Sequence, residues 1–220
     1  MPLVAELVGP TGVGKSALSE WLARRSGVTR ASVWNLPRAW WLLNAVRSLP
    51  TLLSVGLRTR PFPSEDMRYL IRLRTLRQVV ERRRAQSVPL VVLDEGPVFA
   101  LAWLRLFGHQ RRRGDVLAAW WKQLLEEWAA VLDLVVLVNA PDAVLMERIR
   151  ARDKSHRVKQ RTDAEIGAFL AAYRGAYEDV IAALTAHSGV QVVTLDSDGA
   201  AIDHTAERLL ELLEERVHVA

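Results

Sequence analysis

The chain has 220 residues, half of them hydrophobic, which suits one α/β domain with a lid or insertion and a sizeable core. There are 30 lysines and arginines against 25 acidic residues, a balance that fits phosphorylated small molecules as well as nucleic acid. The absence of cysteine excludes disulfides, Cys-ligated zinc and thiol catalysis. The N-terminus lacks the pattern of a signal peptide and no apolar run reaches membrane-spanning length, so we expect a cytoplasmic protein.

The strongest motif lies near the N-terminus. It is the P-loop pattern G-x-x-x-x-G-K-[ST], formed by Gly9, Pro10, Thr11, Gly12, Val13, Gly14, Lys15 and Ser16. The motif follows an apolar run at 3–8, which predicts a strand, and precedes a helix-like segment at 17–23. In such a loop the backbone N–H groups and the helix N-terminus bind phosphate. We expect Lys15 to reach the β- and γ-phosphates of ATP and Ser16 to coordinate Mg²⁺.

A second strand is predicted over residues 28–34 by its β-branched residues. Residues 38–57 are rich in Trp and Leu and are interrupted by Pro50 and Gly56, which predicts one or two strongly apolar helices joined at the proline. We interpret this stretch as part of a helical insertion, about 36–87, packed over the acceptor site. A membrane-surface helix or a partner-binding face is the alternative, because an interfacial helix uses the same residue types.

A helix is predicted over residues 64–86, where leucines and valines recur at helical spacing. Most of its arginines are expected to form a solvated face. One of them, Arg72 or Arg74, is our choice for a group that reaches into the cleft and holds an anionic acceptor.

A buried strand is predicted at 89–93, because an apolar run there ends in Asp94 and Glu95. Such a strand delivers carboxylates to the carboxyl edge of a parallel sheet, where these folds bind ligands. Asp94 is the Walker B candidate for Mg²⁺. Either Asp94 or Glu95 is expected to act as the general base toward an acceptor hydroxyl.

The next segments alternate between helix and strand. Helices are predicted at 98–107 and 115–130 and a strand at 132–138, and Pro141 with Asp142 opens another helix. The three tryptophans of the 115–130 helix are expected to pack in the core. The glycine-bounded basic loop at 108–114 is interpreted as a solvated turn, and its His109 carries no metal signal.

Basic residues are densest at 148–161, which we interpret as a mobile lid over the triphosphate. Thr162-Asp163-Ala164-Glu165 forms a capping box for a helix that runs to about His187. A last strand at 189–196 and an amphipathic helix at 203–217 complete the chain. The alternation predicts the fold class α/β, a three-layer P-loop NTPase fold with five parallel strands and a helical lid or insertion, in a single domain over 1–220.

The P-loop, the strand that ends at Asp94 and the basic lid together resemble the thymidylate kinase-like branch of P-loop nucleoside and nucleotide kinases. The lid carries the closest match, because the family pattern R-I-x-x-R-x-x-x-D-R aligns with residues 148–157. The following helix, with Phe169, Arg174 and Tyr177, also looks like the family's. The resemblance implies that Arg148, Arg152 and Arg157 stabilise the transferring phosphoryl group.

The chain also departs from that family. The family has an Asp-Arg pair after the third strand, whereas this chain has Asp94-Glu95, so the expected arginine is missing. In the lid, His156 replaces the family's aspartate. Lys159 lies where acidic residues are usual, and the acceptor-binding turn R-E-P-G is not recognisable at 34–38. The resemblance therefore implies phosphoryl transfer and does not imply thymidylate as the acceptor.

The sequence predicts an ATP- and Mg²⁺-dependent kinase whose acceptor is a nucleoside or a nucleoside monophosphate, with room for a more apolar alcohol or a phosphorylated sugar. An alternative is an ATP-binding switch that docks segment 40–57 on a partner or a membrane. A third hypothesis is an RNA-modifying kinase that uses the basic segments 68–84 and 148–161, although we expect no nucleic-acid partner. A peripheral membrane contact and a homodimer both stay open.

Overall fold

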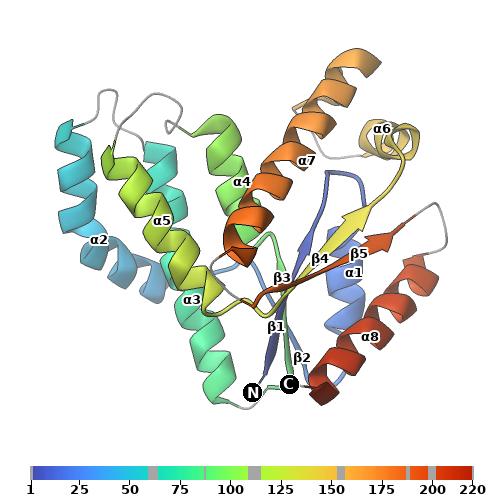
Figure 1. Cartoon of the computed structure of the whole chain (residues 1–220), viewed down its shortest axis with the longest axis horizontal. Coiled ribbons are helices and arrows are strands. Elements are labelled where there is room, and N and C mark those ends of the chain that lie inside the picture. The colour runs from blue at the N-terminus through green and yellow to red at the C-terminus, as the bar shows by residue number, and fades with distance from the viewer. Residues whose placement is uncertain are drawn as a thin grey trace.

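The structure is a computed structural model, and it describes residues 2–58, 64–86, 88–108, 115–152, 157–186, 189–197 and 202–219 (Figure 1). Five strands form one sheet in the order β2-β3-β1-β4-β5, and every neighbouring pair is parallel. The strands are β1 (Leu3–Val8), β2 (Val28–Ala31), β3 (Leu90–Asp94), β4 (Leu134–Asn139) and β5 (Gln191–Asp196). Because the order reverses beside β1, the carboxyl ends of β1 and β3 form the crevice where such sheets bind ligands.

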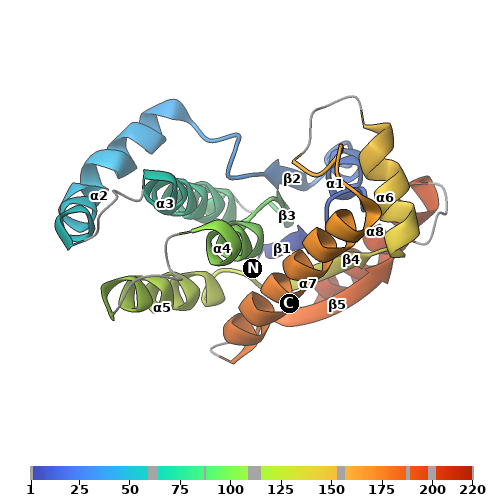
Figure 2. The same ribbon diagram turned by 90° about the horizontal axis from the view of Figure 1, so that it is seen from above.

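Eight helices are described, and they cover both faces of the sheet (Figure 2). They are α1 (Lys15–Leu22), α2 (Arg38–Arg58), α3 (Ser64–Ala85), α4 (Pro97–Phe107), α5 (Asp115–Ala129), α6 (Asp142–Ala151), α7 (Asp163–Thr185) and α8 (Ile202–Val219). One apolar core lies between the sheet and α3, α4, α5 and the second half of α7, and the other includes α1, α6 and α8. Along β1, Val4 and Val8 point into the first core, whereas Leu3, Ala5 and Leu7 point into the second. The predicted three-layer fold class is confirmed.

The predicted elements are present, with small shifts at their ends. The second strand was predicted to 34 but ends at Ala31, and the Val33 N–H donates to Glu95 O at 3.2 Å instead of continuing the ladder. The helix at 163 ends at Thr185, and its Thr162–Glu165 capping box is formed as predicted. His109 and the rest of 109–114 lie outside the described residues, as do 153–156 of the predicted lid.

The Trp- and Leu-rich stretch forms a single helix, α2, with Pro50 inside it. Proline has no N–H to donate and its ring crowds the preceding turn, so it bends a helix. Figure 1 shows α2 changing direction along its length on the outer side of α3. Among the described residues, no helix is both long and apolar enough to cross a bilayer.

Candidate active site

The loop at 9–14 connects β1 to α1 and has the backbone shape that its glycines allow. Gly9 has a φ of 152°, and a Cβ there would lie 2.2 Å from the Val138 carbonyl oxygen, so no other residue fits without a rearrangement. Gly14 caps α1 in the left-handed region, at a φ of 98°. Thr11, Gly12, Gly14, Lys15 and Ser16 line a cavity of about 880 Å³, whereas Val13 is buried in the core.

Lys15 lies across the loop that precedes it. Its Nζ donates to the carbonyl oxygens of Gly9 at 2.7 Å and Pro10 at 3.1 Å. Burial lowers the pKa of the Lys15 ammonium to about 8, although the Asp94 and Glu95 carboxylates oppose this shift. Lys15 is therefore a cation held at the cavity wall, at the position where a P-loop lysine meets phosphate.

Asp94 ends β3 next to the P-loop strand, paired in register with Leu7. Its Oδ2 accepts from Arg30 Nη2 at 2.5 Å and lies 3.2 Å from Ser19 Oγ. The other oxygen, Oδ1, is buried without a hydrogen-bond partner. Asp94 does not line the cavity, so its carboxylate lies behind the wall that an acceptor would contact.

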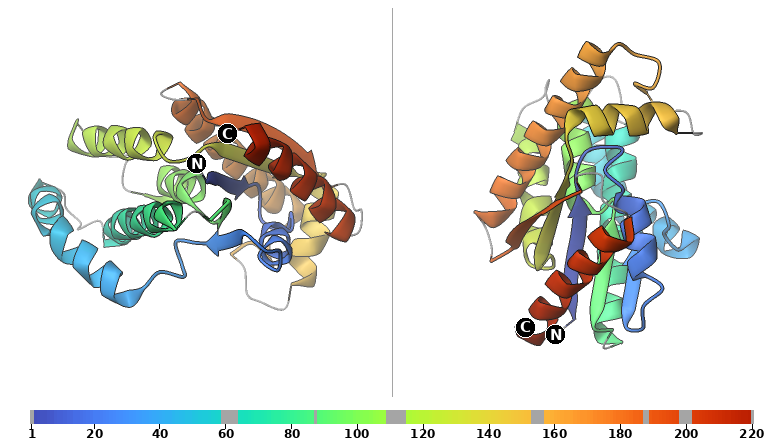
Figure 3. Two further views of the ribbon diagram at one scale, coloured as in Figure 1. Left: turned by 90° about the horizontal axis from the view of Figure 1, so that it is seen from below. Right: turned by 90° about the vertical axis from the view of Figure 1, so that its right-hand side faces the viewer.

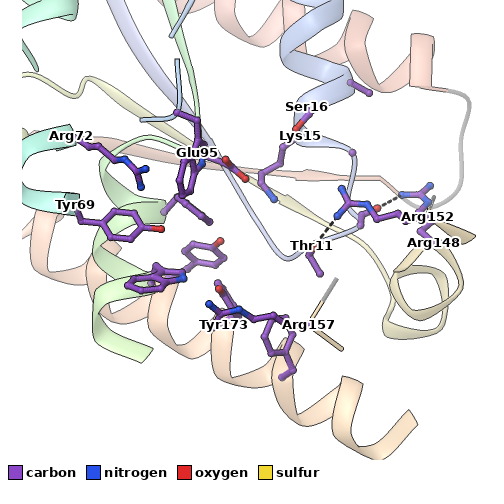
Figure 4. Close-up of a pocket in the computed structure, with 18 of the residues that line it drawn as sticks. Thr11, Lys15, Ser16, Tyr69, Arg72, Glu95, Arg148, Arg152, Arg157 and Tyr173 are labelled. Atoms are coloured by element: carbon purple, nitrogen blue, oxygen red, sulfur yellow. Dashed lines mark hydrogen bonds between the residues drawn. The ribbon is translucent and has the colours of Figure 1, made fainter. Parts of the chain in front are cut away.

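Glu95 lines the cavity together with Lys15 (Figure 4). With a φ of 58°, Glu95 is the one non-glycine residue with positive φ among those described. Such strained backbone conformations are concentrated at functional sites. Burial raises the pKa of Glu95, and the neighbouring Asp94 raises it further, while a hydrogen bond from the Trp34 side chain lowers it. Of the two predicted carboxylates, Glu95 is the one placed to accept a proton from a bound acceptor.

Glu6, which the sequence analysis did not select, is fully buried beneath the turn that carries Glu95. Its two carboxylate oxygens accept from the N–H groups of Gly96 at 3.0 Å, Val98 at 2.8 Å and Phe99 at 3.0 Å. Burial raises the pKa of Glu6 to about 8 even though these three N–H donors oppose the shift. A side chain of β1 thereby caps the first turn of α4 and fixes the turn after β3.

The oxygen groups near the P-loop fit a Mg²⁺ ion. The Ser16 hydroxyl is exposed to the cavity, and Asp94 contributes the unpartnered Oδ1. Mg²⁺ binds through one or two protein oxygens plus substrate phosphates and water. The described residues contain no cluster of three or more His, Cys, Asp or Glu that could hold a metal ion.

The three lid arginines identified by the family pattern all line the cavity. Arg148 Nη1 lies 3.5 Å from Gly12 O, and Arg152 Nη1 donates to Thr11 Oγ1 at 3.1 Å. Arg157 lies on the opposite side, with its guanidinium 4.8 Å from the centre of the Phe107 ring. Lys159 donates to the Arg152 carbonyl oxygen and so ties the segment after 157 back to the end of α6.

The other end of the cavity is lined by aromatic rings from α3, α4 and α7. Tyr69 stacks on Trp103 with centroids 4.5 Å apart, and Trp34 meets Tyr69 edge-on at 6.0 Å. On the α7 side, Phe169 and Tyr177 flank Tyr173 at 4.8 and 5.8 Å. We call these six residues the aromatic wall. It offers flat apolar surface, which suits the ring of an acceptor.

Arg72 is placed at this aromatic end and Arg74 is not (Figure 4). The Arg72 guanidinium lies 4.1 Å from the Trp34 ring centre and 5.6 Å from that of Tyr69. Arg74 instead donates to Ser48 Oγ at 2.9 Å, away from the cavity. Burial lowers the pKa of Arg72. Of the two predicted anion-binding arginines, Arg72 is therefore the one that an acceptor can reach.

Glu6, Arg30 and much of the aromatic wall were not predicted from the sequence. Glu6 carried a usable signal, because a carboxylate inside a run of buried strand residues requires partners. Phe169, Tyr173 and Tyr177 recur every fourth residue and so share one helix face. Arg174, which was singled out with them, lies elsewhere: it pairs with Asp142 at 2.5 Å and fixes the start of α6.

No family model matches the sequence, and no curated protein matches it. Among solved structures, the 1.7 Å crystal structure of shikimate kinase from Bacteroides thetaiotaomicron is similar, with a TM-score of 0.50 and 18% sequence identity. The match covers 96% of this chain and 98% of that one. At this identity the likeness concerns the fold, and it extends over nearly the whole length of both chains. The chain thus shares the fold of a P-loop kinase, and its predicted place in the thymidylate kinase-like branch stays a prediction.

Proposed function

We propose that this protein transfers the γ-phosphoryl group of ATP to a hydroxyl or phosphate oxygen of a small acceptor. The observation that carries the proposal is one cavity that joins a P-loop lysine, a partly buried carboxylate and an aromatic wall with an arginine (Figure 4). Phosphoryl transfer needs positioning and charge stabilisation more than covalent chemistry. These residues supply both, at opposite ends of one space.

The chemistry follows from where the charges lie. The P-loop N–H groups and Lys15 hold the β- and γ-phosphates, and Ser16 and Asp94 are the residues that would hold Mg²⁺, which neutralises phosphate charge when bound. Glu95 takes the proton of the acceptor hydroxyl as the acceptor oxygen bonds to the γ-phosphorus. The bond from that phosphorus to the β,γ-bridging oxygen breaks, and ADP leaves with the electron pair.

The lid arginines act on the charge that develops during this step. Arg148 and Arg152 lie beside the P-loop, and Arg157 lies across the cavity on the aromatic side. A single arginine placed on the transferring group is worth roughly 10³–10⁵ in rate. Closure of segment 148–161 over the nucleotide would bring these cations together and exclude water.

A nucleoside or a nucleoside monophosphate is our proposed acceptor class. The aromatic wall matches a base, and Arg68, Arg72 and Arg157 line the same end and match a monophosphate. The test is ADP release from Mg·ATP in the presence of nucleosides, nucleoside monophosphates and phosphorylated sugars. Stimulation of at least about tenfold by one acceptor, lost in Lys15→Ala and, at limiting Mg²⁺, in Asp94→Asn, supports the proposal.

A second candidate is a nucleotide-binding switch that docks the apolar helix α2 on another surface. It is favoured by the four leucines and one valine of α2 that are exposed to solvent. The same assay separates the two candidates. ATP binding without acceptor-stimulated ADP release, across the whole panel, contradicts the kinase and favours the switch.

A further inference from the structure

Helix α2 carries an outward apolar face. Nine large hydrophobic side chains are exposed among the described residues, and five of them lie on this helix. Val46, Leu53 and Leu42 are the most exposed, at 63%, 61% and 60%, and Leu43 and Leu49 lie beside them. Residues 42, 46, 49 and 53 are spaced by four, three and four positions, so they form one stripe along the helix.

The side of α2 that packs on α3 includes buried polar side chains. Asn44 and Ser48 are buried, and Asn44 Nδ2 lies within 3.2 Å of both Thr75 Oγ1 and Gln78 Oε1 on α3. Ser48 Oγ accepts from Arg74 at 2.9 Å. This part of α2 therefore departs from the usual arrangement of a surface helix, because polar side chains are buried and large apolar ones are exposed.

The charged residues of α2 itself have one sign. No aspartate or glutamate occurs between Glu20 and Glu65, whereas Arg38 and Arg47 are exposed on α2. At 100° per residue, Arg38 falls next to Leu49 at one border of the stripe, and Arg47 falls beyond Leu43 on the other side. Figure 3 shows α2 along the outside of α3, at the end of the molecule away from α8. The stripe with its two arginines is called the α2 face below.

We propose that the α2 face binds the interfacial region of an anionic membrane, with its leucines and Val46 among the acyl chains and its arginines at the headgroups. A helix with an apolar face bordered by cations is the form that lies in such an interface. A second copy of this chain fits less well, because a two-fold pairing of two α2 faces brings arginines together with no carboxylate to meet them. The proposal is independent of the kinase activity.

The experiment is sedimentation of the full chain with vesicles, without nucleotide. Vesicles of phosphatidylcholine alone are compared with vesicles that contain about 30% phosphatidylglycerol, at about 0.1 M and about 0.5 M salt. We expect binding to the anionic vesicles at low salt and weaker binding at high salt. No sedimentation with anionic vesicles at low salt overturns the proposal.

Two variants and a matched control locate the surface. Val46→Asp should weaken vesicle binding at least about tenfold, because it places a carboxylate in the apolar stripe. Val192→Asp makes the same change at an exposed valine of β5, and it should leave binding within about twofold. Arg38→Ala with Arg47→Ala should cost about fivefold per arginine and remove the preference for anionic lipid.

Other results identify another occupant. Equal losses in Val46→Asp and Val192→Asp contradict the assignment to α2. A dimer in sedimentation velocity that Val46→Asp dissociates means that a second copy covers the stripe, and the membrane proposal is then wrong. Both valines are solvent-exposed, and circular dichroism with thermal unfolding verifies that each variant remains folded.

Discussion

The two ends of the cavity are built in different ways. The proposed phosphate end comes from one continuous segment, 9–16, whose contacts are made by backbone groups and Lys15. The proposed acceptor end takes Trp34 from a loop, Tyr69 and Arg72 from α3, Trp103 from α4 and Tyr173 from α7. A site formed by backbone groups requires glycines at fixed spacing in the sequence. A site formed by side chains requires only that suitable groups from different elements meet in the fold. The first kind of end is therefore visible in a sequence, and the second is visible only in the fold.

The largest expected effect is at the phosphate end. Lys15→Ala removes the cation at the cavity wall, and kcat/KM for ATP should fall by at least about 10³. Lys122→Ala is the control, because Lys122 is exposed on α5 and forms a long ion pair with Glu126, at 3.7 Å. Steady-state kinetics measure both variants. A fall of less than tenfold in Lys15→Ala would mean that this loop does not hold the transferred phosphate.

At the junction of the two ends, Glu95→Gln should lower kcat by about 10²–10⁴ and leave the Kd for ATP unchanged, because it removes only the proton acceptor. Asp94→Asn is the comparison. It should instead raise the Mg²⁺ concentration needed for half-maximal activity, since Asp94 faces away from the acceptor. If Asp94→Asn alone lowers kcat at saturating Mg²⁺, the two carboxylates have the opposite roles.

At the acceptor end, Arg72→Ala should raise the KM of an anionic acceptor about 10- to 100-fold and leave ATP binding unchanged, because a charged hydrogen bond is lost. Arg74→Ala is the control, because Arg74 lies two residues further along the same helix and donates to Ser48 outside the cavity. Its acceptor KM should stay within about twofold of the native value. Similar effects in both variants would show that α3 is disturbed as a whole.

The smallest expected effect is the pH dependence of the phosphate end. Because burial lowers the pKa of Lys15 to about 8, the side chain is a cation below that pH and becomes neutral above it. Binding of phosphates above pH 8 then requires proton uptake, so the Kd for ATP should be constant below pH 8 and rise by up to about tenfold per pH unit above it. Lys15→Arg should remove this rise, since a guanidinium does not titrate there. Calorimetric titration at several pH values measures both proteins, and a flat native profile between about pH 8 and 9 would contradict the shifted pKa.

The fold was predictable because its signals are local. Each buried parallel strand is a short apolar run between helices, and each helix has a cap or a period that marks it, such as Thr162 and Glu165. What local signals could not give was the end of β2, because the Val33 N–H bonds to Glu95 O, which is far away in sequence.

The site was predictable only in part, for the same reason. The sequence pattern selected Lys15 and the lid arginines, and these line one cavity. It could not separate Asp94 from Glu95, or Arg72 from Arg74, because the choice depends on which way each side chain points. The pairing of Asp94 with Arg30 joins β3 to the edge strand and has no counterpart in the spacing of residues.

The carboxylate of Glu6 has a consequence for how this protein can change. It holds the turn at 96–99 through three main-chain N–H groups, and these are present whatever side chains α4 carries. Gly96 is the exception, since a Cβ there would lie 2.8 Å from Glu6 Cδ. The side chain at position 99, which lines the cavity, can therefore be changed to any residue except proline without losing its main-chain bond to Glu6. Under the proposed function, this would let one scaffold take new acceptors by point substitution, and the same freedom is open to protein engineering.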